Sequence, residues 1–177
     1  MKKLILLLSF IIFSLSGYTQ GKINSFKIED GKLVWEKIFN TDLDFDQLVV
    51  AVKKTKLLSN IKVGENKITA TVDSVRTNHC EAGYSFTECP HNISESIMSG
   101  VVELKFKTGA YKIDFRDIGF VSTKKGTGGR RYSIEWYELR RRNTMFQSNF
   151  RDKTSKIYSY EFSKLFQFNK FISDDNW

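Results

Sequence analysis

The chain has 177 residues, of which 41% are hydrophobic and 14% aromatic, and its formal net charge is +8. This length and apolar content are typical of one globular domain that buries roughly 70% of its unfolded surface, and they exclude an intrinsically disordered chain. A single proline, with neither an internal repeat nor a low-complexity tract, gives no sign of a linker or a second domain.

The first twenty residues have the pattern of a secretory signal peptide. Lys2 and Lys3 form a basic start, residues 4–15 an apolar stretch, and residues 16–20 a small and polar exit. The stretch is shorter than the roughly 20 apolar residues that span a bilayer, and no cysteine follows it for lipid attachment. We therefore expect cleavage near residue 20, a single domain over residues 21–177 without a membrane span, and a secreted or periplasmic location.

The first half of the expected domain predicts strands around one helix. Apolar and polar residues alternate through residues 26–30 and 32–39, on either side of an Asp30-Gly31 turn, so these segments predict a hairpin. Residues 41–46 offer side chains that cap a helix running to about Leu58. Two strands then follow, at residues 61–63 and 67–75.

The second half predicts a hairpin and a closing helix. Residues 76–99 lose the periodicity and predict a long polar loop, after which residues 100–107 and 110–121 alternate around Thr108-Gly109. Residues 132–143 predict a short helix or an irregular excursion. The last helix is expected over residues 156–171, with Thr154 or Ser155 as its N-cap.

The element order is therefore β-β-α-β-β-β-β-α. Short links between the strands favour antiparallel pairing, because a hairpin needs few connecting residues. The prediction is an α+β fold with an antiparallel sheet of about six strands and two helices on one face.

Three segments carry a resemblance to a known family: residues 28–35 (IEDGKLVW), the pattern Gly100-x-Val-x-Leu-x-Phe-Lys-x-Gly-x-Tyr-Lys112, and the aromatic tail from Ile157 to Trp177. In these the chain resembles a family of small secreted Bacteroidota proteins, a domain of unknown function with a TATA-binding-protein-like fold. The resemblance covers about residues 26–172. It implies the fold and no activity, because the family has no assigned catalytic residues and shape does not fix function.

Cys80 and Cys89 are the two cysteines of the chain, and His79 and His91 lie next to them. In an oxidising compartment a disulfide would close this short loop and stabilise the fold by about 2 to 3 kcal/mol on the chain-entropy model. Two free loop thiols are the alternative. A zinc site is disfavoured, because adjacent His-Cys ligands strain a tetrahedral geometry and neither half has the spacing of a zinc knuckle.

Basic residues concentrate between positions 124 and 142, where Glu135 and Glu138 are the only acids. The candidate anion contacts are Lys124, Lys125, Arg130, Arg131, Arg140, Arg141 and Arg142. The glycines at 126–129 lack the Gly-Lys-Ser/Thr ending of a phosphate loop. Nucleic acid is a disfavoured partner, because three consecutive arginines point to different sides of a helix and make no continuous stripe.

The sequence contains no catalytic signature and implies no cofactor and no metal. It favours a non-catalytic binding or interaction module that contacts an anionic surface or a protein partner. The alternative is a small extracytoplasmic hydrolase that uses loop residues 76–99, among them His79 and Ser85. No triad is visible in that loop, because each histidine lies within a few residues of any candidate nucleophile.

Overall fold

The computed structural model describes residues 22–123 and 129–171, so the expected signal peptide lies outside the described residues. The strands are β1 (Phe26–Glu29), β2 (Lys32–Asn40), β3 (Leu58–Val63), β4 (Lys67–Arg76), β5 (Ser96–Lys107), β6 (Ala110–Ser122), β7 (Arg131–Ser133), β8 (Leu139–Arg140) and β9 (Met145–Phe146). The helices are α2 (Phe45–Lys54), α3 (His91–Ser94), α4 (Ile134–Glu138) and α5 (Ser155–Leu165), with the short helices η1 (Phe86–Glu88), η2 (Phe150–Thr154) and η3 (Phe168–Phe171).

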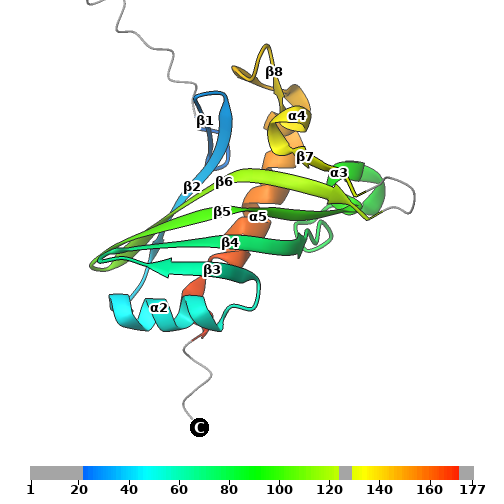
Figure 1. Cartoon of the computed structure of the whole chain (residues 1–177). Coiled ribbons are helices and arrows are strands. Elements are labelled where there is room, and N and C mark those ends of the chain that lie inside the picture. Colours follow the sequence, from blue (N-terminus) through cyan, green and yellow to red (C-terminus); the bar gives the residue numbers. More distant parts are fainter. Residues whose placement is uncertain (1–21, 124–128, 172–177) are drawn as a thin grey trace, which may run out of the picture.

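Strands β1 to β7 form one antiparallel sheet in the order β1-β2-β6-β5-β4-β3, in which β7 also pairs with β6. In Figure 1, α5 crosses behind this sheet and α2 lies along its lower edge. Buried residues of both helices belong to one core with the inward residues of the strands. The predicted α+β fold, with an antiparallel sheet of about six strands and two helices on one face, is therefore confirmed.

The two faces of the sheet follow from alternation along the strands. In β6, Tyr111, Ile113 and Phe115 are buried in the core, whereas Lys112, Asp114 and Arg116 point to the opposite face. The pairing register shifts at Asn60 in β3, at Ser74 in β4 and at Asp117 in β6. All three residues have positive φ. Such bulges increase the local twist of a sheet.

The core is dominated by aromatic rings, and Phe162 of α5 lies at its centre. Its ring centroid is 4.9 Å from that of Phe115, 5.5 Å from that of Trp35 and 5.9 Å from those of Phe26 and Tyr158. The first two contacts are edge-to-face, the arrangement that aromatic quadrupoles favour. Phe162 therefore joins the last helix to strands that lie far from it in the sequence.

The first helix begins as predicted and ends earlier. Asp44 and Gln47 form a capping box, in which each side chain accepts the other's backbone N–H. The helix stops at Lys54 rather than near Leu58, because the Thr55 backbone turns to an extended conformation and Leu58 already belongs to β3.

The last helix differs more from its prediction. A π-helical turn, η2, leads directly into α5, so the Thr154 backbone is already helical, and neither predicted residue caps the helix. The Thr154 hydroxyl instead donates to the Asn149 carbonyl at 3.4 Å. At the other end, the Tyr111 hydroxyl donates to the Phe166 carbonyl and accepts the Phe168 N–H, which separates α5 from η3.

Candidate interaction surfaces

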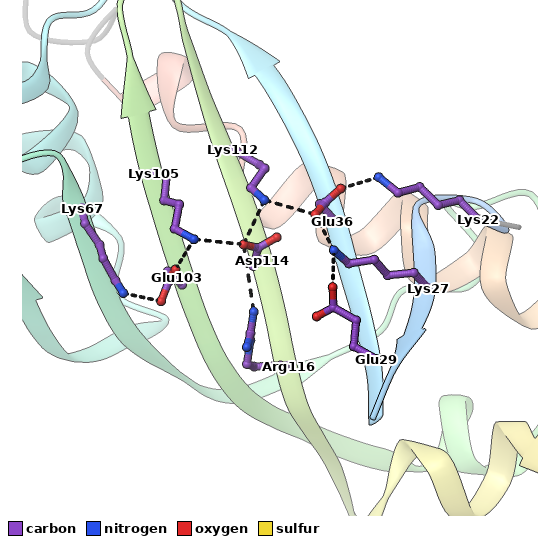
Figure 2. A network of polar contacts seen from close by, with 10 residues as sticks. All are labelled: Lys22, Lys27, Glu29, Glu36, Lys67, Glu103, Lys105, Lys112, Asp114 and Arg116. Carbon is purple, nitrogen blue, oxygen red and sulfur yellow. Dashed lines mark hydrogen bonds and ion pairs between the residues drawn. The ribbon is translucent and has the colours of Figure 1, made fainter. Parts of the chain in front are cut away.

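The face of the sheet that points away from α5 carries a network of charged side chains (Figure 2). We call it the charged face, and its members are Lys22, Lys27, Glu29, Glu36, Lys67, Glu103, Lys105, Lys112, Asp114 and Arg116. They come from β1, β2, β4, β5 and β6 and from the segment before β1. Six are cations and four are carboxylates, so the charged face has a net positive charge.

Strand register arranges these charges in rows across the sheet. Glu103 is opposite Asp114, and Asp114 is opposite Glu36, so three carboxylates lie side by side on neighbouring strands. Lys67, Lys105 and Lys112 form the next row in the same way. Like charges directly opposite one another are unfavourable by themselves, so each row depends on the other for its stability.

The lysines bridge the carboxylates of adjacent strands. The Lys112 ammonium is 3.1 Å from a Glu36 oxygen and 3.2 Å from an Asp114 oxygen. The Lys105 ammonium is 2.8 Å from Glu103, and Lys67 is 2.5 Å from the other oxygen of Glu103. On the side toward β1, Glu36 also forms ion pairs with Lys27, whose ammonium nitrogen is 2.6 Å from a carboxylate oxygen, and with Lys22. The result is a continuous network from β4 to β1.

The charges of this face lie in two layers. The side chains of Glu36, Glu103 and Asp114 are only 14%, 20% and 5% exposed. Those of Lys22, Lys67 and Lys105 are 56%, 48% and 53% exposed. The short acids lie close to the strands and the long lysines extend over them. An approaching molecule therefore meets ammonium groups first.

The network also shifts the pKa values of its members. Hydrogen bonds from Lys105 and Lys67 lower the pKa of Glu103 to about 2. Burial disfavours ionisation of Glu36, but hydrogen bonds from Lys22, Lys27 and Lys112 outweigh it and hold the pKa of that carboxyl well below its usual range. Burial likewise opposes the charge on Lys112, whose pKa is nevertheless raised by Glu36 and Asp114. These groups are charged at neutral pH.

Two polar atoms of the charged face are buried without a hydrogen-bond partner among the described residues. They are Oδ1 of Asp114 and Nε of Arg116. The first accepts a hydrogen bond and the second donates one.

The predicted anion contacts do not form one patch. Arg131 is held in place: its guanidinium donates to the Asp117 carbonyl at 2.5 Å and lies so close over Gly119 that a Cβ there would be 2.3 Å from it. The Arg130 guanidinium lies 5.3 Å from the centre of the Tyr132 ring. Lys124 and Lys125 lie outside the described residues.

The other three arginines lie elsewhere: Arg140 ends β8, and Arg141 and Arg142 lie on the connection between β8 and β9. These two strands pair with each other and not with the main sheet. Figure 1 shows β8 at the top of the molecule, away from the end where β7 begins. We call residues 140–144 the arginine turn; all three of its arginines are exposed.

The cysteine loop, residues 77–95, packs against α5 and η2. Cys89 and Ile93 are buried in the core, and the loop is fixed from outside by the Lys164–Glu81 ion pair. Both cysteines are free thiols in the structure, so the predicted disulfide is not formed here. Burial, and then the neighbouring Cys80, raise the pKa of the Cys89 thiol to about 11.

The loop does not pair the Ser85 hydroxyl with the His79 ring. The Ser85 hydroxyl donates to Glu88 at 2.7 Å rather than to His79, and both ring nitrogens of His79 are buried without a partner in the described chain. An activated serine needs a base within hydrogen-bond reach. The hydrolase alternative therefore gains no support from the described residues of this loop.

Residues 22–123 and 129–171 contain no group of three or more His, Cys, Asp and Glu side chains arranged to hold a metal ion. None of their helices combines the length and the apolar character needed to cross a bilayer.

The sequence analysis did not predict the charged face, although the sequence contains a pattern that indicates it. Lys112, Asp114 and Arg116 occupy alternate positions of a strand, as do Glu103 and Lys105. Alternation identifies them as outward residues of a half-buried sheet. Which strands lie side by side, and hence which charges meet, depends on the pairing of β2 with β6, which are about seventy residues apart along the chain.

The fold and the charged face together define an α+β protein with one helix-covered and one open, charged sheet face. No protein-family model matches the chain, and the search of curated proteins finds no match. Among solved structures, a DUF4468 family protein from Bacteroides ovatus is similar with a TM-score of 0.50 and 15% identity, over 90% of this chain and 96% of that one. A TBP-like protein from Parabacteroides distasonis has a TM-score of 0.48 and 13% identity, over 81% and 96%. The first likeness confirms the resemblance stated above at the level of the fold.

Proposed function

We propose that this chain is an exported, non-catalytic binding module whose charged face docks an acidic protein partner. The observation that carries the proposal is the two-layer arrangement, in which exposed lysines extend over a row of shielded carboxylates. A surface that presents ammonium groups attracts carboxylates and steers them during encounter. The basic start and short apolar stretch of residues 1–15 support export.

Apolar side chains among the charges favour a protein partner. Ile38 is 64% exposed and lies on the same face as Glu36, and Val101 is 41% exposed and lies on the same face as Glu103. A protein surface offers apolar side chains as well as carboxylates. A simple polyanion offers only the charge.

The internal carboxylates limit the strength of this interaction. Each lysine already has an acidic neighbour, so a partner adds to existing pairs and does not neutralise bare cations. Exposed pairs contribute about 0.2 to 1 kcal/mol each and are screened by salt. We therefore expect moderate, salt-sensitive affinity.

Binding of a fluorescent oligoglutamate peptide to the purified protein tests the proposal. Substitution of Lys67, Lys105 and Lys112 by Gln is expected to weaken binding about 10- to 100-fold, because three ammonium groups are lost. Raising the salt concentration from about 0.05 M to about 0.5 M should weaken wild-type binding similarly. Fluorescence anisotropy gives the dissociation constants.

A matched control removes the same charge from another place. Substitution of Arg140, Arg141 and Arg142 by Gln lowers the net charge equally and is expected to leave peptide binding within about twofold of wild type. Circular dichroism verifies that both triple variants fold. Equal weakening of peptide binding by both triple variants would show that only net charge matters and would overturn the proposal. A dissociation constant that does not change with salt concentration would also overturn it.

Oxidation of Cys80 and Cys89 to a disulfide after export is part of the same proposal. A disulfide-bearing oxidant is attacked by the exposed Cys80 thiolate. Cys89 then displaces the oxidant as a thiol, so that two protein thiols are oxidised and the oxidant is reduced to its dithiol. Because Cys89 is buried and its pKa is about 11, we expect the second step to be slow at neutral pH.

Mass spectrometry of the exported protein tests the bridge. We expect a mass lower by two hydrogens than after reduction, and no alkylation of either cysteine before reduction. The Cys80→Ser variant serves as the control, because it cannot form the bridge. Two thiols that alkylate readily in the exported protein would contradict the expectation.

A further inference from the structure

The arginine turn has an unusual backbone. Arg141, Arg142 and Asn143 have φ values of 52°, 57° and 64°, so three successive residues other than glycine adopt the left-handed conformation. The turn is closed by the Thr144 N–H, which donates to the Arg140 carbonyl at 3.2 Å, and by the Thr144 hydroxyl, which donates to the Arg141 carbonyl at 2.7 Å. Residues other than glycine, asparagine and aspartate rarely adopt this conformation, because their side chains crowd the backbone. Backbone strain of this kind is more frequent at functional sites than elsewhere.

Trp136 lies four residues before the arginine turn and is 73% exposed. It belongs to α4, a short helix that is fixed from its inner side. Buried Glu135 accepts the Leu33 backbone N–H at 2.9 Å, and buried Glu138 is hydrogen-bonded to Tyr158. The indole is therefore held outward by a rigid support, although its transfer out of water would be favourable.

The segment that follows α4 is basic along the sequence. Residues 139–151 contain four arginines and no acid. In the described chain, none of the three arginines of the turn takes part in an ion pair. Figure 1 shows β8 and α4 together at the end of the molecule where the β1–β2 hairpin also lies. An exposed indole and three guanidinium groups without an ion pair among the described residues thus lie on neighbouring elements at this end.

We propose that Trp136 and the arginine turn contact the surface of an anionic phospholipid bilayer. Arginine pairs with lipid phosphates in a bidentate manner, and tryptophan is favoured at the boundary between headgroups and acyl chains. An exposed turn suits a flat bilayer, whereas a free phosphate would need a concave site. This contact lies apart from the charged face and would hold an exported protein at a membrane without a spanning segment.

Partition to phosphatidylglycerol vesicles tests the proposal, with the exported protein carrying Trp177→Phe. Trp35 is fully buried, so Trp136 then reports the contact, and its emission is expected to shift to shorter wavelength when vesicles are added. Replacing Arg140, Arg141 and Arg142 by Gln should weaken partition about 100-fold, at roughly fivefold for each cation near an anionic surface. Trp136→Ala should weaken it about tenfold.

A second variant separates binding from folding. Arg142→Gly relieves a left-handed residue and is expected to keep or raise the unfolding temperature while it weakens partition about fivefold. Substitution of Lys67, Lys105 and Lys112 by Gln, which removes an equal charge from the charged face, should leave partition within about twofold. The two proposals can therefore fail independently: loss of oligoglutamate binding would leave the expected vesicle partition unchanged.

Several results would overturn the membrane proposal. Vesicles that leave the Trp136 emission unchanged would do so, as would equal partition to phosphatidylcholine and phosphatidylglycerol vesicles. A spectral shift with soluble glycerol phosphate but not with vesicles would assign the turn to free phosphate. Equal loss of partition in the two triple variants would reduce the effect to net charge.

Discussion

Substitution of Phe162 by Ala is expected to lower the free energy of unfolding by about 3 to 5 kcal/mol, the usual range for removal of a fully buried aromatic ring. The ring is inaccessible to solvent and contacts four other aromatic rings, from β1, β2, β6 and its own helix. Its removal leaves a cavity where α5 meets the sheet, which the rigid surrounding rings can fill only in part. Urea unfolding followed by circular dichroism measures the change.

The matched control for this prediction is Phe86→Ala. Phe86 is 56% exposed in the cysteine loop, so the same loss of a benzyl group should change stability by less than about 0.5 kcal/mol. A loss below about 1 kcal/mol for Phe162→Ala would contradict the packing of α5 against the sheet.

Stability is also expected to fall steeply in acid, because of the charged face. The pKa values of Glu36 and Glu103 are lower in the folded protein than their ordinary value of 4.5. A carboxyl with a lowered folded-state pKa contributes stability that is complete above its unfolded pKa and disappears as the pH falls through the folded one. The contribution of Glu103 should therefore be present at neutral pH and be lost between about pH 4.5 and about pH 2, whereas that of Glu36, whose pKa is lower still, should persist further into acid.

The Glu36→Gln and Glu103→Gln variants isolate this effect. Each is expected to be less stable than wild type by about 1 to 2 kcal/mol at neutral pH, since hydrogen bonds to lysines are lost. The difference should vanish near pH 2 for Glu103→Gln and only at lower pH for Glu36→Gln. Glu65→Gln, at an exposed position of the β3–β4 turn, should change stability by less than about 0.5 kcal/mol at any pH. A difference for Glu36→Gln that is independent of pH would show that its carboxylate is not coupled to the lysines.

Sequence patterns were sufficient for the fold wherever the signal is local. The Asp30-Gly31 turn, with positive φ at both residues, and the alternation from Ala110 onward gave the hairpins. The prediction that Thr154 caps the last helix was wrong, because the presence of a capping residue type does not reveal that a π-helical turn already leads into the helix. The arginines from 130 to 142 appeared as one cluster, since sequence distance does not reveal that β7 joins the main sheet while β8 and β9 pair apart.

The sequence by itself determined which residues face the core and which face water, because periodicity along a strand or helix depends only on near neighbours. It likewise indicated export through residues 1–20 and a basic balance of charge. Only the tertiary structure decided that Glu36, Asp114 and Glu103 would share a row beneath the lysines, and that Trp136 would stand outward beside the arginine turn. Those neighbours are brought together by pairing and packing of distant segments, and no local pattern specifies them.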